Sequence, residues 1–135
     1  MGLPGSGKTT LSKLLSKKLG SDIFNADQIR KKLNDWDFSD EGRIRQAKRM
    51  RDYCDNEIKK NKKKFIIADF ICPTDQAREI FDADFIIWLD TIKKGRFEDT
   101  NKLFTPPGNF DFRITEQNAE YWSEKIYNKL MSLIK

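Results

Sequence analysis

The sequence predicts an α/β domain of three layers, in which helices cover both faces of a mostly parallel sheet. Two continuous apolar runs, 65–68 and 85–89, have the length of a strand, and each is followed by Asp. Strands that are buried on both faces have this appearance. Helical patterns lie between the strand patterns, and such alternation is typical of a parallel sheet. Because 135 residues suffice for one compact domain, we expect a single domain over residues 1–135.

Each element has a local signal. Leu residues at helical spacing mark the first helix, and Gly20 provides its stop. Ser39, followed by two acidic residues, is a typical helix start. The polar segment 95–109 contains Pro106-Pro107-Gly108 and is expected to form a loop or lid. The expected helices cover 9–19, 26–33, 39–61, 74–81 and 116 onward, and the expected strands cover 22–24, 65–68, 85–89 and, as a weak edge strand, 111–114.

The composition limits the chemistry that this chain can perform. It contains no His, which excludes His-based acid–base catalysis and most zinc sites. Cys54 and Cys72 have no CxxC spacing, so we expect buried free thiols in a reducing cytoplasm. No apolar run reaches the roughly 18 residues of a membrane span. The net charge of +5 favours an anionic partner such as a phosphorylated small molecule, with nucleic acid and a homodimer left open.

A phosphate-binding motif stands at the start of the chain. The run Gly2-Leu3-Pro4-Gly5-Ser6-Gly7-Lys8-Thr9 matches G-x-x-x-x-G-K-[ST] at every fixed position and opens into the first expected helix. Glycines let backbone N–H groups turn toward phosphates, and the helix N-terminus adds the positive end of its dipole. Lys8 is expected to reach the β and γ phosphates of ATP, and Thr9 offers its hydroxyl to Mg²⁺. The expected ATP-binding residues are Gly2, Pro4, Gly5, Ser6, Gly7, Lys8, Thr9 and Thr10.

A buried strand should precede such a loop, yet only Met1 precedes Gly2. The N-terminal, central strand of the expected sheet is therefore absent from this chain. Either the chain as given starts several residues late, or the domain tolerates a defective sheet centre. We favour the late start.

Two carboxylates follow expected strands and are candidates for the reaction. Asp27 comes just after the strand at 22–24, where an Asp of a small-molecule kinase can take the proton of the acceptor hydroxyl or hold Mg²⁺. Asp69 ends the next strand and can hold Mg²⁺ through water, with a strand-terminal cap as the alternative. Lys8 and Asp27 are the expected catalytic residues, and Thr9 and Asp69 are the expected metal ligands.

Further short motifs follow the loop in a fixed order: Thr10, Asp27-Gln28-Ile29-Arg30, Leu33-Asn34, Phe38-Ser39 with Arg43, Phe70-Ile71-Cys72-Pro73, Asp90-Thr91 and Phe104-Thr105. In order and approximate spacing the chain resembles the adenylylsulfate kinases (APS kinases), which phosphorylate the 3′-hydroxyl of adenosine 5′-phosphosulfate (APS). The resemblance extends through nearly the whole chain. It implies a P-loop kinase fold with ATP and Mg²⁺ as cofactors and APS as the acceptor.

The resemblance also implies roles at an acceptor site. Phe38 and Phe104 match two rings that sandwich the adenine, and base stacking contributes on the order of 1–3 kcal/mol per base. Arg30 and Arg43 match two arginines that grip the phosphosulfate, which suits a planar guanidinium. Core packing is the alternative for the rings, and a solvated helix face is the alternative for the arginines. The implied acceptor site is completed by Asp27, Gln46, Phe70 and Ile71.

The chain departs from the family pattern in two ways. Asn25, Gln28, Gln46 and Asp69 stand where the family has other residues, which leaves the identity of the acceptor open. The lid before Phe104 is shortened, and its Arg96 and Lys102 remain to meet the transferring phosphoryl group or the ATP base. A short lid is expected to exclude water less completely and to allow more ATP hydrolysis without transfer. The alternatives are a P-loop kinase of another small metabolite, nucleoside or nucleic acid, and a nucleotide-binding module without turnover.

Overall fold

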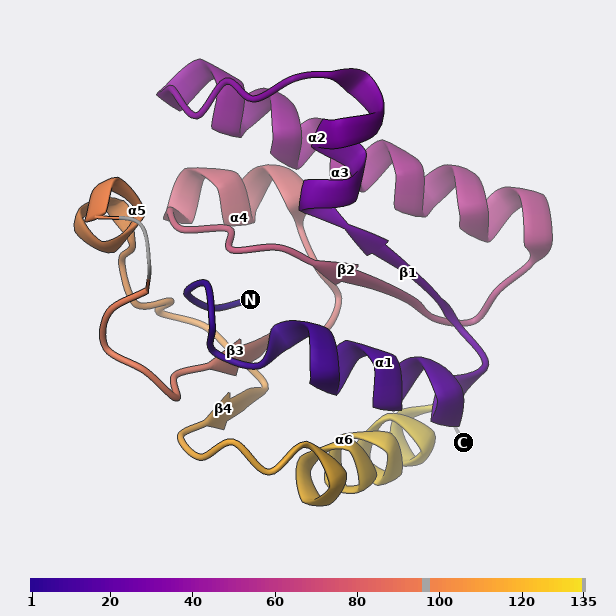
Figure 1. Cartoon of the computed structure of the whole chain (residues 1–135). Coiled ribbons are helices and arrows are strands. Elements are labelled where there is room, and N and C mark those ends of the chain that lie inside the picture. Colours follow the sequence, from indigo (N-terminus) through magenta and orange to yellow (C-terminus); the bar gives the residue numbers. More distant parts are fainter. Residues whose placement is uncertain (96–97, 135) are drawn as a thin grey trace.

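The structure, a computed structural model, describes residues 1–95 and 98–134 and has the expected α/β class (Figure 1). The helices are α1 (Lys8–Leu19), α2 (Ala26–Leu33), α3 (Asp40–Asn61), α4 (Asp75–Phe81), α5 (Glu98–Leu103) and α6 (Ala119–Leu133). The strands are β1 (Asp22–Asn25), β2 (Ile66–Asp69), β3 (Ile87–Leu89) and β4 (Phe112–Ile114).

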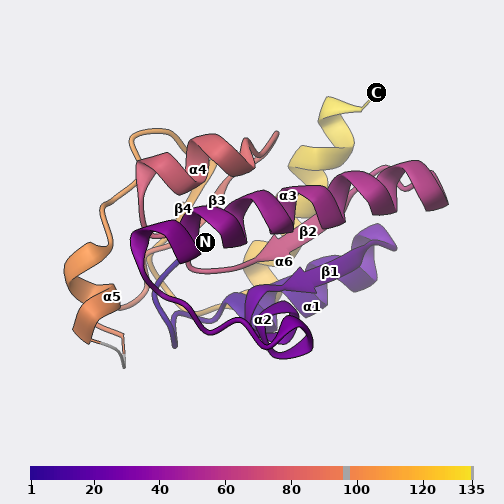
Figure 2. The same ribbon diagram turned by 90° about the horizontal axis from the view of Figure 1, so that it is seen from above.

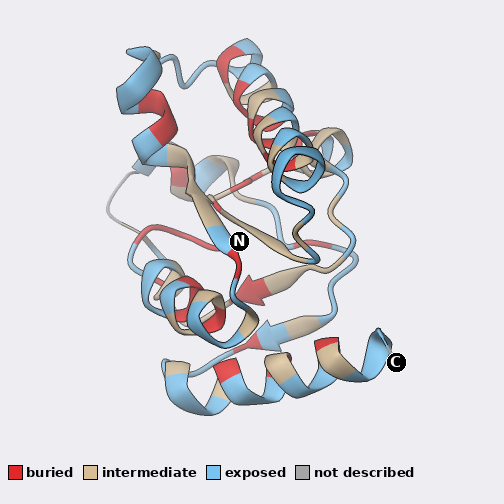
Figure 3. Ribbon diagram, turned by 90° about the vertical axis from the view of Figure 1, so that its right-hand side faces the viewer, coloured by how far each residue is buried: buried red, intermediate tan, exposed pale blue. Residues whose placement is uncertain are grey.

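Helices cover both faces of the strands and complete three layers, as Figures 1 and 2 show. On one face α1 packs against α6, and on the other α3 packs against α4. The larger core lies between α1, α6 and the pair of β3 and β4, and its buried members are Leu11, Leu15, Leu89, Ile114, Ile126 and Leu130. A smaller cluster is formed by Ala47 of α3, Ala77 of α4 and Cys72, which precedes α4. The buried residues lie on the inward sides of the helices, in the phosphate-binding loop and at the carboxyl ends of β2, β3 and β4 (Figure 3).

Side-chain caps determine where several helices begin. In each case a side-chain oxygen accepts a hydrogen bond from a backbone N–H of the first turn, as it does for Asn25 at α2, Ser39 at α3, Thr74 at α4 and Asn118 at α6. Such a cap contributes about 1 kcal/mol to helix stability. Asn25 is also the last residue of β1, so α2 starts directly at the carboxyl end of that strand.

The strands are parallel but do not form one continuous sheet. β1 pairs with β2, and β3 pairs with β4, with all pairs parallel. Met1 and Gly2 pair with β3 on the side that faces β2: the Met1 nitrogen donates to the carbonyl oxygen of Ile87 at 2.7 Å, and Gly2 bridges to Leu89. A cavity of about 450 Å³ remains between β2 and β3, lined by apolar residues of both strands and of α1. The two pairs of strands are therefore separated by a gap.

The structure differs most from the sequence prediction in the lid and at the start of the last helix, whereas the other bounds shift by at most two residues. The expected lid contains a short helix, α5, which lacks an apolar stripe. The last helix begins at Ala119 rather than near Glu116, because Asn118 provides its cap. Among the described helices, none combines the length and the apolar character that crossing a bilayer requires.

Candidate active site

The phosphate-binding loop turns sharply into α1. Gly7 is the N-cap of α1 and has a φ of 101°, a left-handed conformation that strains any residue with a side chain. The first turn of an α-helix carries backbone N–H groups that point away from the helix body, and an anion can accept hydrogen bonds from them. The Nζ atom of Lys8 lies 3.0 Å from the carbonyl oxygen of Leu3, to which it donates. The loop thus places an ammonium group beside a helix N-terminus, as phosphate binding requires.

One cavity of about 850 Å³ opens in front of this loop. It is bounded by the phosphate-binding loop and α1, by the carboxyl ends of β1 and β2, and by the start of α3. Most residues that the sequence singled out line it: Pro4, Gly5, Gly7, Lys8, Thr9, Thr10, Asp27, Arg30, Phe38, Arg43, Gln46, Asp69, Phe70 and Ile71. A volume of this size suits small organic ligands. Residues that are distant in the sequence therefore face one space.

The carboxyl ends of β1 and β2 place two polar side chains, Asn25 and Asp69, beside the phosphate-binding loop. Asp69 is only 4% exposed, and its Oδ2 atom accepts from Thr9 Oγ1 at 3.3 Å and from Asn25 Nδ2 at 3.2 Å. Mg²⁺ is bound in nucleotide sites through few protein oxygens plus phosphate oxygens and water. The hydroxyl of Thr9 and the carboxylate of Asp69 fit that requirement. Among the described residues, no group of three or more His, Cys, Asp or Glu gathers into a larger cation site.

Asp27 lies in the first turn of α2 and is exposed on the wall of the cavity. The cap by Asn25 holds this turn against the end of β1, where the same side chain also reaches Asp69. The two carboxylates have different surroundings, since Asp69 is buried and tied to Thr9 whereas Asp27 faces open space. This difference favours a metal-holding role for Asp69 and leaves Asp27 accessible to a second substrate.

The two arginines of the predicted acceptor site have different partners. Arg30 is 4% exposed, and its Nη1 atom donates to the carbonyl oxygens of Asp35 and Asp37 at 3.0 Å each. Burial lowers the pKa of Arg30. Arg43 donates through Nε to the carbonyl oxygen of Phe38, at 3.0 Å. Both guanidinium groups lie over the Phe38 ring, with Arg30 at 4.4 Å and Arg43 at 5.5 Å from its centroid.

Some predicted site residues do not lie at this cavity. Gly2 pairs with β3. Ser6, within the phosphate-binding loop, is fully buried and lines a smaller cavity of about 220 Å³. Phe104 is not among the described residues that line the large cavity, and the guanidinium of Arg78 lies 5.3 Å from its ring centroid. Arg96 falls outside the described residues.

The structure also adds residues that the sequence analysis did not select. Trp36, Thr100 and Gln117 line the large cavity, and Gln117 Nε2 donates to the carbonyl oxygen of Gly5 at 3.0 Å. Gln117 reaches the phosphate-binding loop from the segment before α6, and no local pattern indicates that contact. Trp36 stands two residues before Phe38, and an aromatic ring in a polar loop was a usable signal.

Comparisons with known proteins show the family and the fold of this chain. A family model described as an AAA domain matches residues 1–102. The chain belongs to this AAA domain family. The match begins at Met1 and covers the phosphate-binding loop, β1, β2 and the residues between them. A comparison with curated proteins returned no match.

Solved structures support the fold over nearly the whole chain. The APS kinase CysC of Mycobacterium tuberculosis in complex with AMPPNP and APS superposes with a TM-score of 0.77 at 18% identity, covering 97% of this chain and 94% of that chain. A sugar kinase from Janibacter sp. HTCC2649 superposes with a TM-score of 0.72 at 17% identity, covering 96% and 91%. At these identities the likeness shows the fold alone, and the fold is that of P-loop kinases. The chain is therefore a P-loop kinase-like domain.

Proposed function

We propose that this AAA-family domain is an ATP-dependent phosphotransferase that phosphorylates the 3′-hydroxyl of APS. The observation that carries the proposal is the cavity of about 850 Å³, which joins the phosphate-binding loop to residues matching an APS site. Phosphoryl transfer needs both substrates in one enclosure, because positioning and charge stabilisation supply most of the catalysis. The superposition with an APS kinase structure supports the fold that this requires.

The phosphate-binding loop is the donor half of the proposed site. The β and γ phosphates of ATP would lie at the N-terminus of α1, with Lys8 as their cation. Thr9 and Asp69 would hold Mg²⁺, which neutralises charge on the phosphates during transfer. Thr10 and Gln117 lie at the same edge of the cavity and would contact the nucleotide.

The acceptor half lies between α2 and α3. Asp27 would take the proton of the 3′-hydroxyl of APS while the hydroxyl oxygen attacks the γ-phosphorus of ATP. ADP would leave as the bond between the γ-phosphorus and the oxygen that bridges the β and γ phosphates breaks. The exposed ring of Phe38 would stack on the adenine, and Arg43 would contribute to binding the phosphosulfate. Arg30 is buried and bound to two backbone carbonyls, so it would act on the acceptor through the loop it holds.

The proposal is tested with a panel of acceptors at saturating ATP and Mg²⁺. ADP formation is measured with APS, adenosine, a simple sugar, a single-stranded oligonucleotide with a free 5′-hydroxyl, and water alone. APS is expected to raise ADP formation at least tenfold above water, and the other acceptors much less. If ADP forms faster with the sugar or the oligonucleotide than with APS, the proposed acceptor is wrong but the proposed kinase chemistry stands. Equal rates with every acceptor and with water would contradict transfer altogether.

A further inference from the structure

Two large aromatic side chains stand exposed on the loop between α2 and α3. Trp36 is 49% exposed and Phe38 is 51% exposed, and both line the large cavity. Aromatic rings of this size normally bury most of their surface in a core or an interface. The resemblance to APS kinases gave a role to Phe38 but none to Trp36. The exposed position of the Trp36 indole therefore has to be explained by the residues around it.

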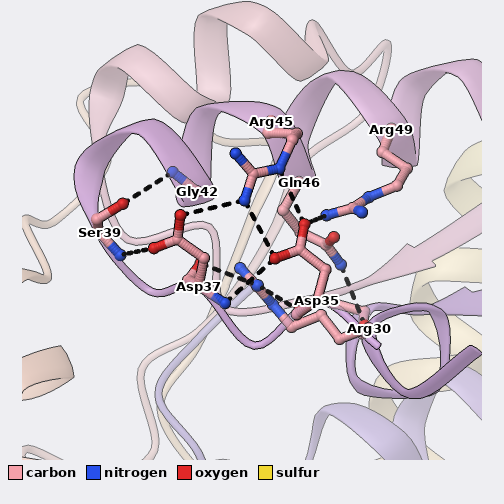
Figure 4. A network of polar contacts seen from close by, with 9 residues as sticks. Arg30, Asp35, Asp37, Ser39, Gly42, Arg45, Gln46 and Arg49 are labelled. Carbon is pink, nitrogen blue, oxygen red and sulfur yellow. Dashed lines mark hydrogen bonds and ion pairs between the residues drawn. The ribbon is translucent and has the colours of Figure 1, made fainter. Parts of the chain in front are cut away.

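Ion pairs brace the loop on both sides of Trp36 (Figure 4). The carboxylate of Asp35 accepts from Arg45 Nε at 2.9 Å, from Arg45 Nη2 at 3.1 Å and from Arg49 Nη2 at 2.9 Å. Arg45 Nη2 also reaches the carboxylate of Asp37, at 3.1 Å. The hydrogen bonds from Arg45, then Arg49, hold the pKa of Asp35 well below its usual value. The residues before and after Trp36 are thus tied to one arginine of α3.

Residues of α2 and α3 also fix the backbone of the same loop. Arg30 of α2 donates to the carbonyl oxygens of Asp35 and Asp37, again on either side of Trp36. Gly42 of α3 packs so closely that a Cβ atom there would lie 2.1 Å from the carbonyl oxygen of Asp37. Arg30 and α3 therefore hold the loop in one conformation. Aromatic surface presented on a rigid support contacts a ligand without losing much conformational entropy on binding.

We propose that Trp36 is a second aromatic contact for the acceptor base and that Asp35 is its positioning residue. The inference rests on the proposed function in that the acceptor carries a nucleobase. Trp36 lines the cavity together with Phe38, whereas Phe104, the ring that the resemblance implies as the second stacking partner, does not. The indole offers a larger face than a phenyl ring for stacking.

The first test separates binding of the acceptor from binding of ATP. Trp36→Ala is expected to raise the KM for APS roughly 5- to 150-fold, the range that loss of one base stack predicts, with the KM for ATP unchanged. Trp36→Phe, which keeps a ring, should recover most of that loss. Tyr121→Ala is the matched control, because Tyr121 is 47% exposed but does not line the cavity. Equal KM values for APS in wild type and Trp36→Ala would overturn the assignment.

A second test examines Asp35 by steady-state kinetics and by fluorescence. Asp35→Asn weakens both arginine contacts, so it should raise the KM for APS while leaving the KM for ATP unchanged, and should make Trp36 more accessible to acrylamide. The Trp36 emission is obtained as the difference between wild type and Trp36→Phe, since the chain has three tryptophans. Asp55→Asn, at the Arg51–Asp55 surface pair, is the control. A lower Tm with both KM values raised together would show a merely structural role and refute positioning.

Fluorescence also distinguishes failure of this inference from failure of the proposed function. Without ATP, APS and adenosine 5′-monophosphate should each quench the Trp36 emission, because stacking on a base is the contact proposed. Quenching without any phosphate transfer to APS would refute the proposed reaction and support Trp36 as a base contact. Transfer to APS with no quenching, and no KM change in Trp36→Ala, would refute Trp36 and leave the reaction standing.

Discussion

Lys8 is the residue whose charge the donor half of the site depends on most directly. It begins α1, beside the N–H groups that an anion would meet, and its ammonium group donates to the carbonyl oxygen of Leu3 in the same loop. Lys8→Ala should reduce phosphoryl transfer by several orders of magnitude while the Tm changes little. Lys18→Ala, in the last turn of the same helix, is the control and should retain full activity. Near-normal turnover in Lys8→Ala would mean that phosphates bind elsewhere.

The two carboxylates near the phosphate-binding loop are predicted to have separable roles. Asp27→Asn should lower kcat about 10²- to 10⁴-fold with a smaller effect on ATP affinity, because it removes the proposed base. Asp69→Asn should instead weaken binding of Mg²⁺–ATP, since Asp69 contacts Thr9. Asp40→Asn, an exposed residue in the first turn of α3, serves as control. If Asp69→Asn alone stopped turnover and Asp27→Asn impaired ATP binding, the two roles would be exchanged.

At the scale of elements, Arg78 of α4 anchors the end of the lid that follows α5. Its Nε atom donates to the carbonyl oxygen of Cys72 at 3.0 Å, and Nη2 donates to that of Thr105 at 2.6 Å. Arg78→Lys keeps the charge but loses the fork, so it should loosen the lid and raise ATP hydrolysis relative to transfer. The ratio of ADP to phosphorylated acceptor measures this. Arg113→Lys, which alters an exposed ion pair with Asp90, is the control and should leave this ratio unchanged. An unchanged ratio in Arg78→Lys would mean that the contacts of Arg78 with the lid do not help to exclude water from the site.

Local signals were sufficient for most elements and for the phosphate-binding loop. Apolar runs predicted β2 and β3, and the caps at Ser39 and Gly20 follow from short-range hydrogen bonding and from a left-handed turn. The helix α5 has no apolar stripe, so periodicity could not reveal it. The approach of Gln117 to Gly5 joins opposite ends of the chain, and only the assembled fold creates it. The ion pairs around Asp35 likewise require α2 and α3 to be packed side by side.

For the molecule as a whole, the gap between β2 and β3 leaves apolar space at the centre of the fold. The gap leaves the facing edges of the two strands without a strand between them, and the apolar cavity there is about 450 Å³. Joining about five alternating Ile and Val residues to the nitrogen of Met1 should raise the Tm and slow amide exchange in both strands, because an added strand buries apolar surface and supplies hydrogen bonds. An extension of Ser and Gly is the control. Equal Tm values for both extensions would mean that the gap does not accept a strand.

For a chain that begins at Met1, the amine at the same gap is expected to make stability depend on pH. Burial, and then the charge of Lys8, lowers the pKa of the Met1 amino group from 8.0 to about 5. Between these values the unfolded chain binds the proton and the folded chain does not, so the free energy of unfolding should fall as the pH drops from 8 to 5. Denaturant unfolding at several pH values measures this. Acetylation of the Met1 nitrogen should remove that part of the pH dependence, and an identical profile after acetylation would contradict burial of the amine.

The most direct measurement of the central claim follows the γ-phosphate of ATP. The protein is incubated with γ-labelled ATP, Mg²⁺ and APS, and the products are separated and identified by mass spectrometry. The account predicts that the label appears on the 3′-oxygen of APS, in amounts equal to most of the ADP formed, and that Lys8→Ala forms none. Label recovered only as inorganic phosphate, with APS unchanged, would contradict it.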